Sequence, residues 1–228
     1  MTRKEDISVW VEDTLLMCPF PFVVTDRKGK KHEMAFYPKT IGKMILTSRI
    51  LKQMDGIKGS ALSIVKKEKR SCAKIVALYT CRTKEEHFDE ELIKERTDLF
   101  AQIDNVELAS LLAYVLTDRI DEAIKHYGLD EESKIMADIK RMKESDNTRV
   151  FGGKSIFGTL IGHFQEKCGW STEHIVWEEP YAVLRMCMAD AVTSVYLSDK
   201  EKKNVPTIER EGTKMKFSDF MEKMHMMR

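Results

Sequence analysis

The feature that most constrains this chain is a spacing of three or four residues between apolar side chains, which recurs along most of its length. The spacing is densest in NVELASLLAYVLTDRIDEAIKHYG, residues 105–128, where Leu108, Leu112 and Val115 belong to a surface that is apolar nearly all round. Such a helix must be enclosed by other elements, because water would otherwise meet apolar side chains on every side. The pattern predicts a mainly α protein, a multi-helix bundle with this segment central to its first subdomain.

The same spacing predicts helices on both sides of the central one. Residues 7–18 favour a helix, with a strand as the alternative. Thr40 is a suitable N-cap for the next helix, and Ser60 opens a longer one that runs through Leu78. Further helices are expected at residues 89–103, at 131–145 with Asp130 as the cap, at 156–168 after Ser155, at 171–179, and at 181–203.

One segment has the pattern of a β-hairpin instead. In PFVVTDRKGKKHEMAFYP, residues 21–38, two apolar runs flank a charged turn that contains Gly29. A two-stranded hairpin alone is marginal in water. We therefore expect one N-terminal β-hairpin that packs on a helix or adds to the sheet of another chain.

A polar stretch ending at Asn147, followed by two glycines, has the composition of a linker. It predicts two helical subdomains, residues 1–145 and 151–228. The glycines belong to GGKS, which invites comparison with a phosphate-binding loop. Such a loop has a glycine five residues before its Gly-Lys-Ser, and this chain has Thr148 there. The expected structure is a glycine hinge followed by an N-cap at Ser155.

Charge and composition exclude several classes of protein. Charged residues make up 33% of the chain but the net charge is +1, so no global field gathers nucleic acid or an anionic membrane. No stretch approaches the roughly 18 apolar residues of a membrane span. The five cysteines are scattered and odd in number, which favours reduced, buried thiols. We expect a soluble intracellular protein.

The residue pattern offers no catalytic or metal-binding constellation. His163, Cys168, His174 and Cys187 fall in one region but lack the tight paired spacing of zinc ligands. Adjacent carboxylates, as in Glu178–Glu179, point in different directions on a helix. We expect no catalytic residues, no metal and no cofactor, and an enzyme is the least supported class.

Fourteen methionines are many for 228 residues, and several gather in the last helix, whose apolar stripe includes Phe220, Met221 and Met224. Flexible thioethers suit surfaces that accept varied partners. We predict that this stripe binds a partner protein.

The segment GGKSIFGTLIGHFQEKCGWSTEHIVWEEPYAVLRMCMADAVTSVYLSD resembles the C-terminal region of phage tail assembly chaperone-like proteins, which phages and prophages encode. The resemblance lies first in Trp170, which stands between Gly169 at the end of one expected helix and Ser171 at the start of the next. It extends to Trp177 on that second helix, and to Tyr181 and Met186 on the longer helix that follows. FYPKTIGKMILTSRIL, after the hairpin, is similar to the first half of such proteins in layout.

The resemblance implies a non-enzymatic chaperone or scaffold in the cytoplasm of the bacterial host. It would bind apolar helices of a tape-measure or tail-tube protein during virion morphogenesis, in a groove that includes Trp170, Trp177, Tyr181, Met186 and Phe220. From the charge and composition of the chain we expect no membrane partner, a nucleic-acid partner is disfavoured, and a homo-oligomer is left open. The alternatives are a structural tail or baseplate component that stays in the virion, and a nucleic-acid-binding regulator, whose binding would fall steeply with salt.

Overall fold

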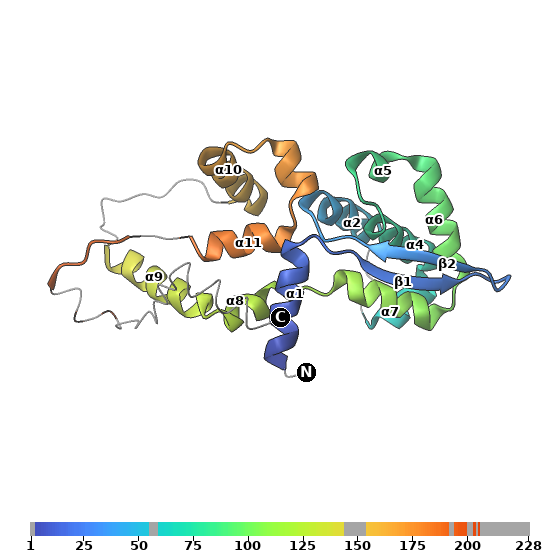
Figure 1. Ribbon diagram of the computed structural model, residues 1–228, viewed down its shortest axis with the longest axis horizontal. Coiled ribbons are helices and arrows are strands. Elements are labelled where there is room, and N and C mark those ends of the chain that lie inside the picture. Colours follow the sequence, from blue (N-terminus) through green and yellow to red (C-terminus); the bar gives the residue numbers. More distant parts are fainter. Residues whose placement is uncertain are drawn as a thin grey trace, which may run out of the picture. The chain divides into compact units, whose positions relative to one another are not determined.

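The computed structural model describes residues 3–54, 59–143, 154–191, 194–199, 203 and 205. These residues are mainly helical, with one antiparallel two-stranded hairpin near the N-terminus (Figure 1), which confirms the predicted fold class. The chain divides into two compact units. The first combines Met1–Asp130 with Arg149–Val192, and the second combines Glu131–Thr148 with Thr193–Arg228. Subdomains that separate at residues 145–151 stay a prediction.

The first unit begins with a helix and the hairpin, continues through seven described helices, and ends with three more. In chain order its elements are α1 (Arg3–Leu15), β1 (Phe20–Thr25), β2 (Lys31–Phe36), α2 (Ile41–Gln53), α3 (Ala61–Lys67), α4 (Lys69–Tyr79), α5 (Lys84–Phe88), α6 (Glu90–Gln102), α7 (Asn105–Leu116), α8 (Ile120–His126), α10 (Ile156–Cys168), the π-helix η1 (His174–Glu178) and α11 (Tyr181–Ala189). The second unit contains most of α9 (Leu129–Lys143).

The hairpin packs on a helix, as predicted. Its register runs from Phe20 opposite Phe36 to Thr25 opposite Lys31. Phe22 stacks on Phe36 with 4.2 Å between ring centroids, and lies 6.3 Å from Phe100 of α6. Burial of this aromatic face against α6 stabilises a hairpin that would be marginal alone.

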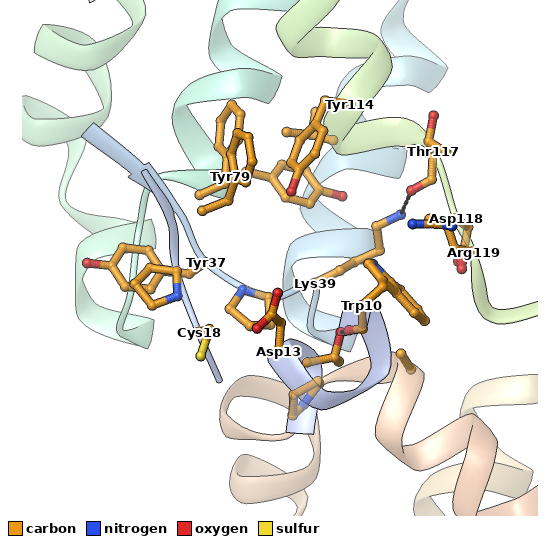
Figure 2. Close-up of a pocket in the computed structure, with 18 of the residues that line it drawn as sticks. Trp10, Asp13, Cys18, Tyr37, Lys39, Tyr79, Tyr114, Thr117, Asp118 and Arg119 are labelled. Atoms are coloured by element: carbon orange, nitrogen blue, oxygen red, sulfur yellow. Dashed lines mark hydrogen bonds between the residues drawn. The ribbon is translucent and has the colours of Figure 1, made fainter. Parts of the chain in front are cut away.

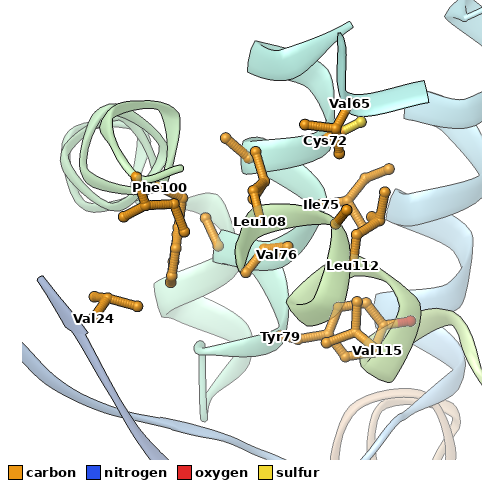
Figure 3. Close-up of a cluster of buried hydrophobic side chains, with 14 of the residues drawn as sticks. Val24, Val65, Cys72, Ile75, Val76, Tyr79, Phe100, Leu108, Leu112 and Val115 are labelled. Carbon is orange, nitrogen blue, oxygen red and sulfur yellow. The ribbon is translucent and has the colours of Figure 1, made fainter. Parts of the chain in front are cut away.

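The main hydrophobic core surrounds α4 (Figure 3). Ile75 and Val76 of α4 are fully buried, and Leu108 and Leu112 of α7 point into the same cluster. The central position expected for the segment that starts at residue 105 is therefore confirmed for α7. Each side chain of this size contributes about 1.5–3 kcal/mol when it is fully buried.

A second core joins α2 to the helices that follow residue 155. Ile41 and Ile175 are fully buried in it, together with Leu160 and Leu184. The Tyr181 N–H donates to the Lys39 carbonyl at 2.7 Å, next to a β-bridge between Thr40 and Pro180. The loop between β2 and α2 is thus fastened to the start of α11.

Two segments predicted as single helices are broken. The helix expected from Ser60 through Leu78 is interrupted at Glu68, where φ is −129° and ψ is 49°. The helix expected over residues 105–128 stops after Leu116, and the Asp118 side chain accepts from the Ile120 N–H at 2.9 Å. A short acidic side chain that caps the next turn competes with helix continuation, which explains the second break.

Two helix boundaries also differ from prediction. The helix α9 begins at Leu129, so Asp130 lies inside it and is not its cap. The helix α11 ends at Ala189, far short of residue 203. Asp190 is its C-cap, and the Asp190 N–H donates to the Met186 carbonyl at 2.9 Å.

Candidate functional site

A cavity of about 620 Å³ lies in the first unit beside α1 and the start of β1 (Figure 2). The loop after β2, the end of α4, the turn between α7 and α8 and the start of α11 complete its walls. Trp10, Tyr37, Tyr79 and Tyr114 supply much of its aromatic lining. Cavities of this size with apolar walls and few polar groups are typical of binding sites.

The end of α1 shapes the mouth of the cavity. The helix stops in a Schellman motif, in which the Cys18 N–H donates to the Asp13 carbonyl at 2.8 Å and the Met17 N–H donates to the Thr14 carbonyl at 3.2 Å. Met17 takes the left-handed conformation with φ at 56°, at a position where glycine is the usual residue. Pro19 follows and turns the chain into β1.

The cavity carries a small set of nearly balanced charges. The Lys39 ammonium donates to the Thr117 carbonyl at 3.3 Å. Burial lowers the pKa of Lys39, while the nearby Asp118 carboxylate opposes that change. The Arg119 guanidinium donates two hydrogen bonds to the two carboxylate oxygens of Asp6, at 3.2 and 3.3 Å. Asp13 adds a third carboxylate to the lining, and these few charges sit among aromatic walls, so apolar contact dominates what the cavity can offer.

Exposed apolar side chains occur in the chain segment that borders the cavity and at two residues that line it. Leu16 is 74% exposed and Leu15 is 59% exposed, and Phe20 stacks on Tyr114 with 4.6 Å between ring centroids. We call Leu15, Leu16, Met17, Phe20 and Tyr114 the apolar rim. Grouped exposed apolar residues of this kind mark interaction sites in soluble proteins.

A second cavity of about 650 Å³ shares Pro19 and Tyr37 with the first. Lys43 lines it although the whole residue is only 1% exposed, and its ammonium donates to the Pro38 carbonyl at 3.1 Å. Burial lowers the pKa of Lys43 to about 7, against the opposing effects of Cys81 and Glu86. The Lys43 amine therefore changes charge near neutral pH.

Of the four predicted partner-binding residues that the structure describes, Trp170 and Tyr181 belong to the second core. Trp170 stacks on Phe164 with 5.5 Å between ring centroids and an interplanar angle of 9°. Met186 packs against the cluster formed by Ile7, Val11 and Ala123. These two side chains are partly buried in different clusters, so the structure does not bring them into one groove.

Trp177 contacts His87 and Phe88, at 5.4 and 5.5 Å between ring centroids. Tyr181 is 5% exposed but lines the aromatic cavity, and Trp177 lines the second cavity together with Lys43. Phe220, Met221 and Met224 lie outside the described residues. A partner-binding role for all seven stays a prediction.

The apolar rim was not predicted from the spacing of apolar residues. Its signal in the sequence is LLMCPF, residues 15–20, a run of consecutive apolar residues that fits neither a helical stripe nor a strand alternation. Such runs on a surface are unfavourable unless they serve binding. The prediction of buried thiols was also wrong in part, since Cys18, Cys168 and Cys187 are exposed, although all five cysteines are free.

The remaining candidates have plain structural roles. The Ser155 hydroxyl accepts from the Gly158 N–H at 3.2 Å and caps α10, as expected for GGKS. In the described ranges, no group of three or more His, Cys, Asp and Glu side chains is placed to hold a metal ion. Among the described helices, none is both long and apolar enough to cross a membrane. Comparison with protein-family models, curated proteins and solved structures gives no match to this chain.

Proposed function

We propose that this protein is a non-catalytic helper that binds an apolar helical segment of another protein through the apolar rim and the adjoining aromatic cavity. The observation that carries the proposal is the exposure of Leu15, Leu16 and Met17, which lie in the chain between Thr14 and Cys18, two residues that line that cavity. A protein that stays dissolved on its own gains nothing from exposing three successive apolar side chains. Exposed apolar side chains become favourable when a partner covers them.

The chemistry of this surface suits reversible capture. Aromatic rings give large contact areas with little loss of side-chain freedom, and Met17 adapts to differently shaped partners. An amphipathic helix presents one apolar side chain per turn, which matches a rim that leads into a cavity. Because Lys39 and Arg119 are internally compensated, no strongly charged partner is required.

The resemblance of residues 152–199 to tail assembly chaperones suggests the biological setting. In that setting the partner is a tape-measure or tail-tube protein in the cytoplasm of a bacterial host. The helper covers the apolar helices of its partner until the tail tube polymerises around them. The predicted residues Trp170, Trp177 and Met186 then act mainly by holding the helices of the first unit in place.

The proposal is tested by affinity capture from cells that produce the encoding phage or prophage, followed by mass spectrometry of the captured proteins and of finished particles. We expect the tape-measure or tail-tube protein in the capture and none of this chain in the particles. Presence in purified particles would support a structural tail component instead.

A matched pair of variants ties capture to the rim. Leu16→Glu places a charge in the rim, whereas Val106→Glu places one on α7 at a residue that is also well exposed, at 61%. Leu16→Glu should abolish capture of the tail protein and Val106→Glu should preserve it, with unchanged circular dichroism for both. Equal capture by the two variants would contradict the proposal.

A further inference from the structure

We propose that the first unit carries a second binding surface, a basic groove that takes an acidic amphipathic helix of a partner protein. The groove is a hollow of about 660 Å³ on the α2, α4 and α6 side of the unit. It shares no lining residue with the apolar rim or the aromatic cavity. Its principal side chains are the cations Arg49, Arg70, Lys74 and Lys94 and the apolar residues Leu46, Ile50, Leu78 and Ile93.

Three packed helices build the groove, each with one stripe of residues. The helix α4 packs against both α2 and α6. Residues 46, 49, 50 and 53 of α2 face the groove, as do 90, 93, 94 and 97 of α6 and 70, 71, 74 and 78 of α4. Spacings of three and four place such residues on one face of each helix. The groove is thus a regular feature of helix packing and not a gap between loops.

The floor of the groove is apolar. Leu78 and Ile93 form a small buried cluster with Cys81, and the partly buried Leu46 and Ile50 pack against it. Phe88 also lines the groove and is 58% exposed. Leu46 and Ile50 lie four residues apart on one helix face and are only partly covered, so the apolar face of a bound helix would cover them.

The edges of the groove are basic. Arg49, Lys74 and Lys94 are exposed cations, and Arg70 is a fourth, which pairs with Asp98 at 2.8 Å. Glu90 is the one carboxylate among the described residues that line the groove. The whole chain has a net charge of only +1, so these cations form a local positive field on a nearly neutral molecule. Such a field speeds association with an oppositely charged partner and selects for it.

The floor favours a protein helix over a nucleic acid. Proteins that bind single strands stack the bases on several aromatic side chains. Among the described residues that line the groove, only Phe88 and the buried His87 carry aromatic rings, and the aliphatic side chains of Leu46, Ile50, Leu78 and Ile93 make up most of the floor. An amphipathic helix with leucine or isoleucine at successive turns would fill that floor. Glutamates on its flanks would then meet the exposed cations on α2, α4 and α6.

The inference does not rest on the proposed function, because the two surfaces have no side chain in common. A fluorescein-labelled synthetic helix of about 18 residues, five turns long, is a direct probe. It carries leucines on one face and glutamates on both flanks. Fluorescence anisotropy with the full chain measures its binding at low and at moderate salt. We expect saturable binding that weakens as salt rises.

Matched charge reversals locate the binding site. Arg49→Glu with Lys74→Glu removes two cations from the groove, and Lys66→Glu with Lys67→Glu makes the same change in charge at the exposed end of α3. The first pair should weaken binding by about tenfold or more, because it reverses contacts that would lie at the interface. The second pair should stay within about twofold of the natural chain. Equal losses in the two double variants would overturn the proposal.

Two further probes test the chemistry of the occupant. A peptide with glutamine in place of each leucine should bind at least about tenfold more weakly, because it cannot fill the apolar floor. Unchanged affinity of that peptide would show charge attraction alone and would overturn the inference. Single-stranded DNA should bind more weakly than the acidic helix at the same salt. If the DNA bound more tightly and lost its binding in Arg49→Glu with Lys74→Glu, the groove would be a nucleic-acid site and the inference would be wrong.

Discussion

The indole ring of Trp177 in η1 occupies the place where a side chain on Gly42 of α2 would begin. Three ring carbons of the indole overlap the position of a Cβ atom on that glycine. The close approach lets η1 lie directly on α2, in the second core. It explains why a glycine is tolerated inside a helix, where it costs about 1 kcal/mol relative to alanine.

The variant Gly42→Ala should therefore destabilise the protein although alanine favours helix. Overpacking against a ring that cannot retreat easily costs about 1–3 kcal/mol. Gly162→Ala in α10 is the matched control, since a Cβ atom there meets no described atom within 4 Å and should raise stability by up to about 1 kcal/mol. Urea unfolding of both variants measures the difference, and a stabilised Gly42→Ala would show that the indole moves aside freely.

Because Met17 has a left-handed backbone conformation, we expect a substitution there to separate the stability of the protein from its binding to a partner. Met17→Gly should stabilise the protein by about 1 kcal/mol, because glycine adopts positive φ without steric cost. Leu16→Gly, one residue earlier, gains no such relief and should lower stability. Thermal unfolding compares the two. If the apolar rim binds a partner, Met17→Gly should also bind it more weakly in spite of its higher stability, which is the pattern of backbone strain kept for function.

Lys43 predicts a specific dependence of stability on pH. Its pKa is about 7 in the folded chain and 10.5 in an unfolded one, so between these values the unfolded chain binds more protons. The free energy of unfolding should therefore rise with pH from about 7 to about 10.5, by up to about 1.4 kcal/mol per pH unit from this group alone. Lys43→Met should remove that slope. The difference between the two unfolding curves isolates the effect, and parallel curves would place the ammonium in contact with water.

His174 predicts the opposite dependence. Its ring lies 2.7 Å from a Glu178 carboxylate oxygen and 3.0 Å from one of Glu179, and these carboxylates, Glu178 first, raise the pKa of His174 above 6.5. The stabilising charged form is fully present below about pH 6.5 and is lost as the pH rises through the folded pKa. Titration by NMR should show this elevated midpoint.

Isosteric variants test the cause of the elevated pKa of His174. Glu178→Gln should lower the midpoint, because it removes the nearer carboxylate. Glu173→Gln is the control, since the Glu173 carboxylate pairs with Lys84 at 2.6 Å. A midpoint that Glu178→Gln leaves unchanged would assign the shift to another group.

Much of the fold is predictable from the sequence because its signals are local. Thr40, Ser60 and Ser155 each accept the expected N-cap hydrogen bond, and Gly169 ends α10 in the left-handed conformation. The breaks at Glu68 and Asp118 were not predictable from apolar spacing, because that spacing continues across both. The break at Asp118 depends on a side-chain hydrogen bond to the Ile120 N–H, which apolar spacing does not register.

The candidate site was less predictable. Trp177 is a large aromatic residue in a helix, and its sequence context does not show that it lies against Gly42. The aromatic cavity draws Trp10, Tyr79 and Tyr114 from three separate helices, so no local motif announces it. LLMCPF was the one local signal of an exposed surface. Its apolar residues are consecutive and have neither helical nor strand periodicity, so a prediction based on periodicity does not detect it.

The short connection between β2 and α2 has a consequence for how the first unit unfolds. The Tyr37 N–H donates to the Tyr79 carbonyl at the end of α4, and the Lys39 carbonyl accepts from Tyr181 at the start of α11. Tyr37 and Lys39, two residues apart in the chain, thus tie one hydrophobic cluster to the other. Neither cluster can open without breaking a bond anchored in its neighbour, so the two should melt in a single cooperative transition despite their separate interiors.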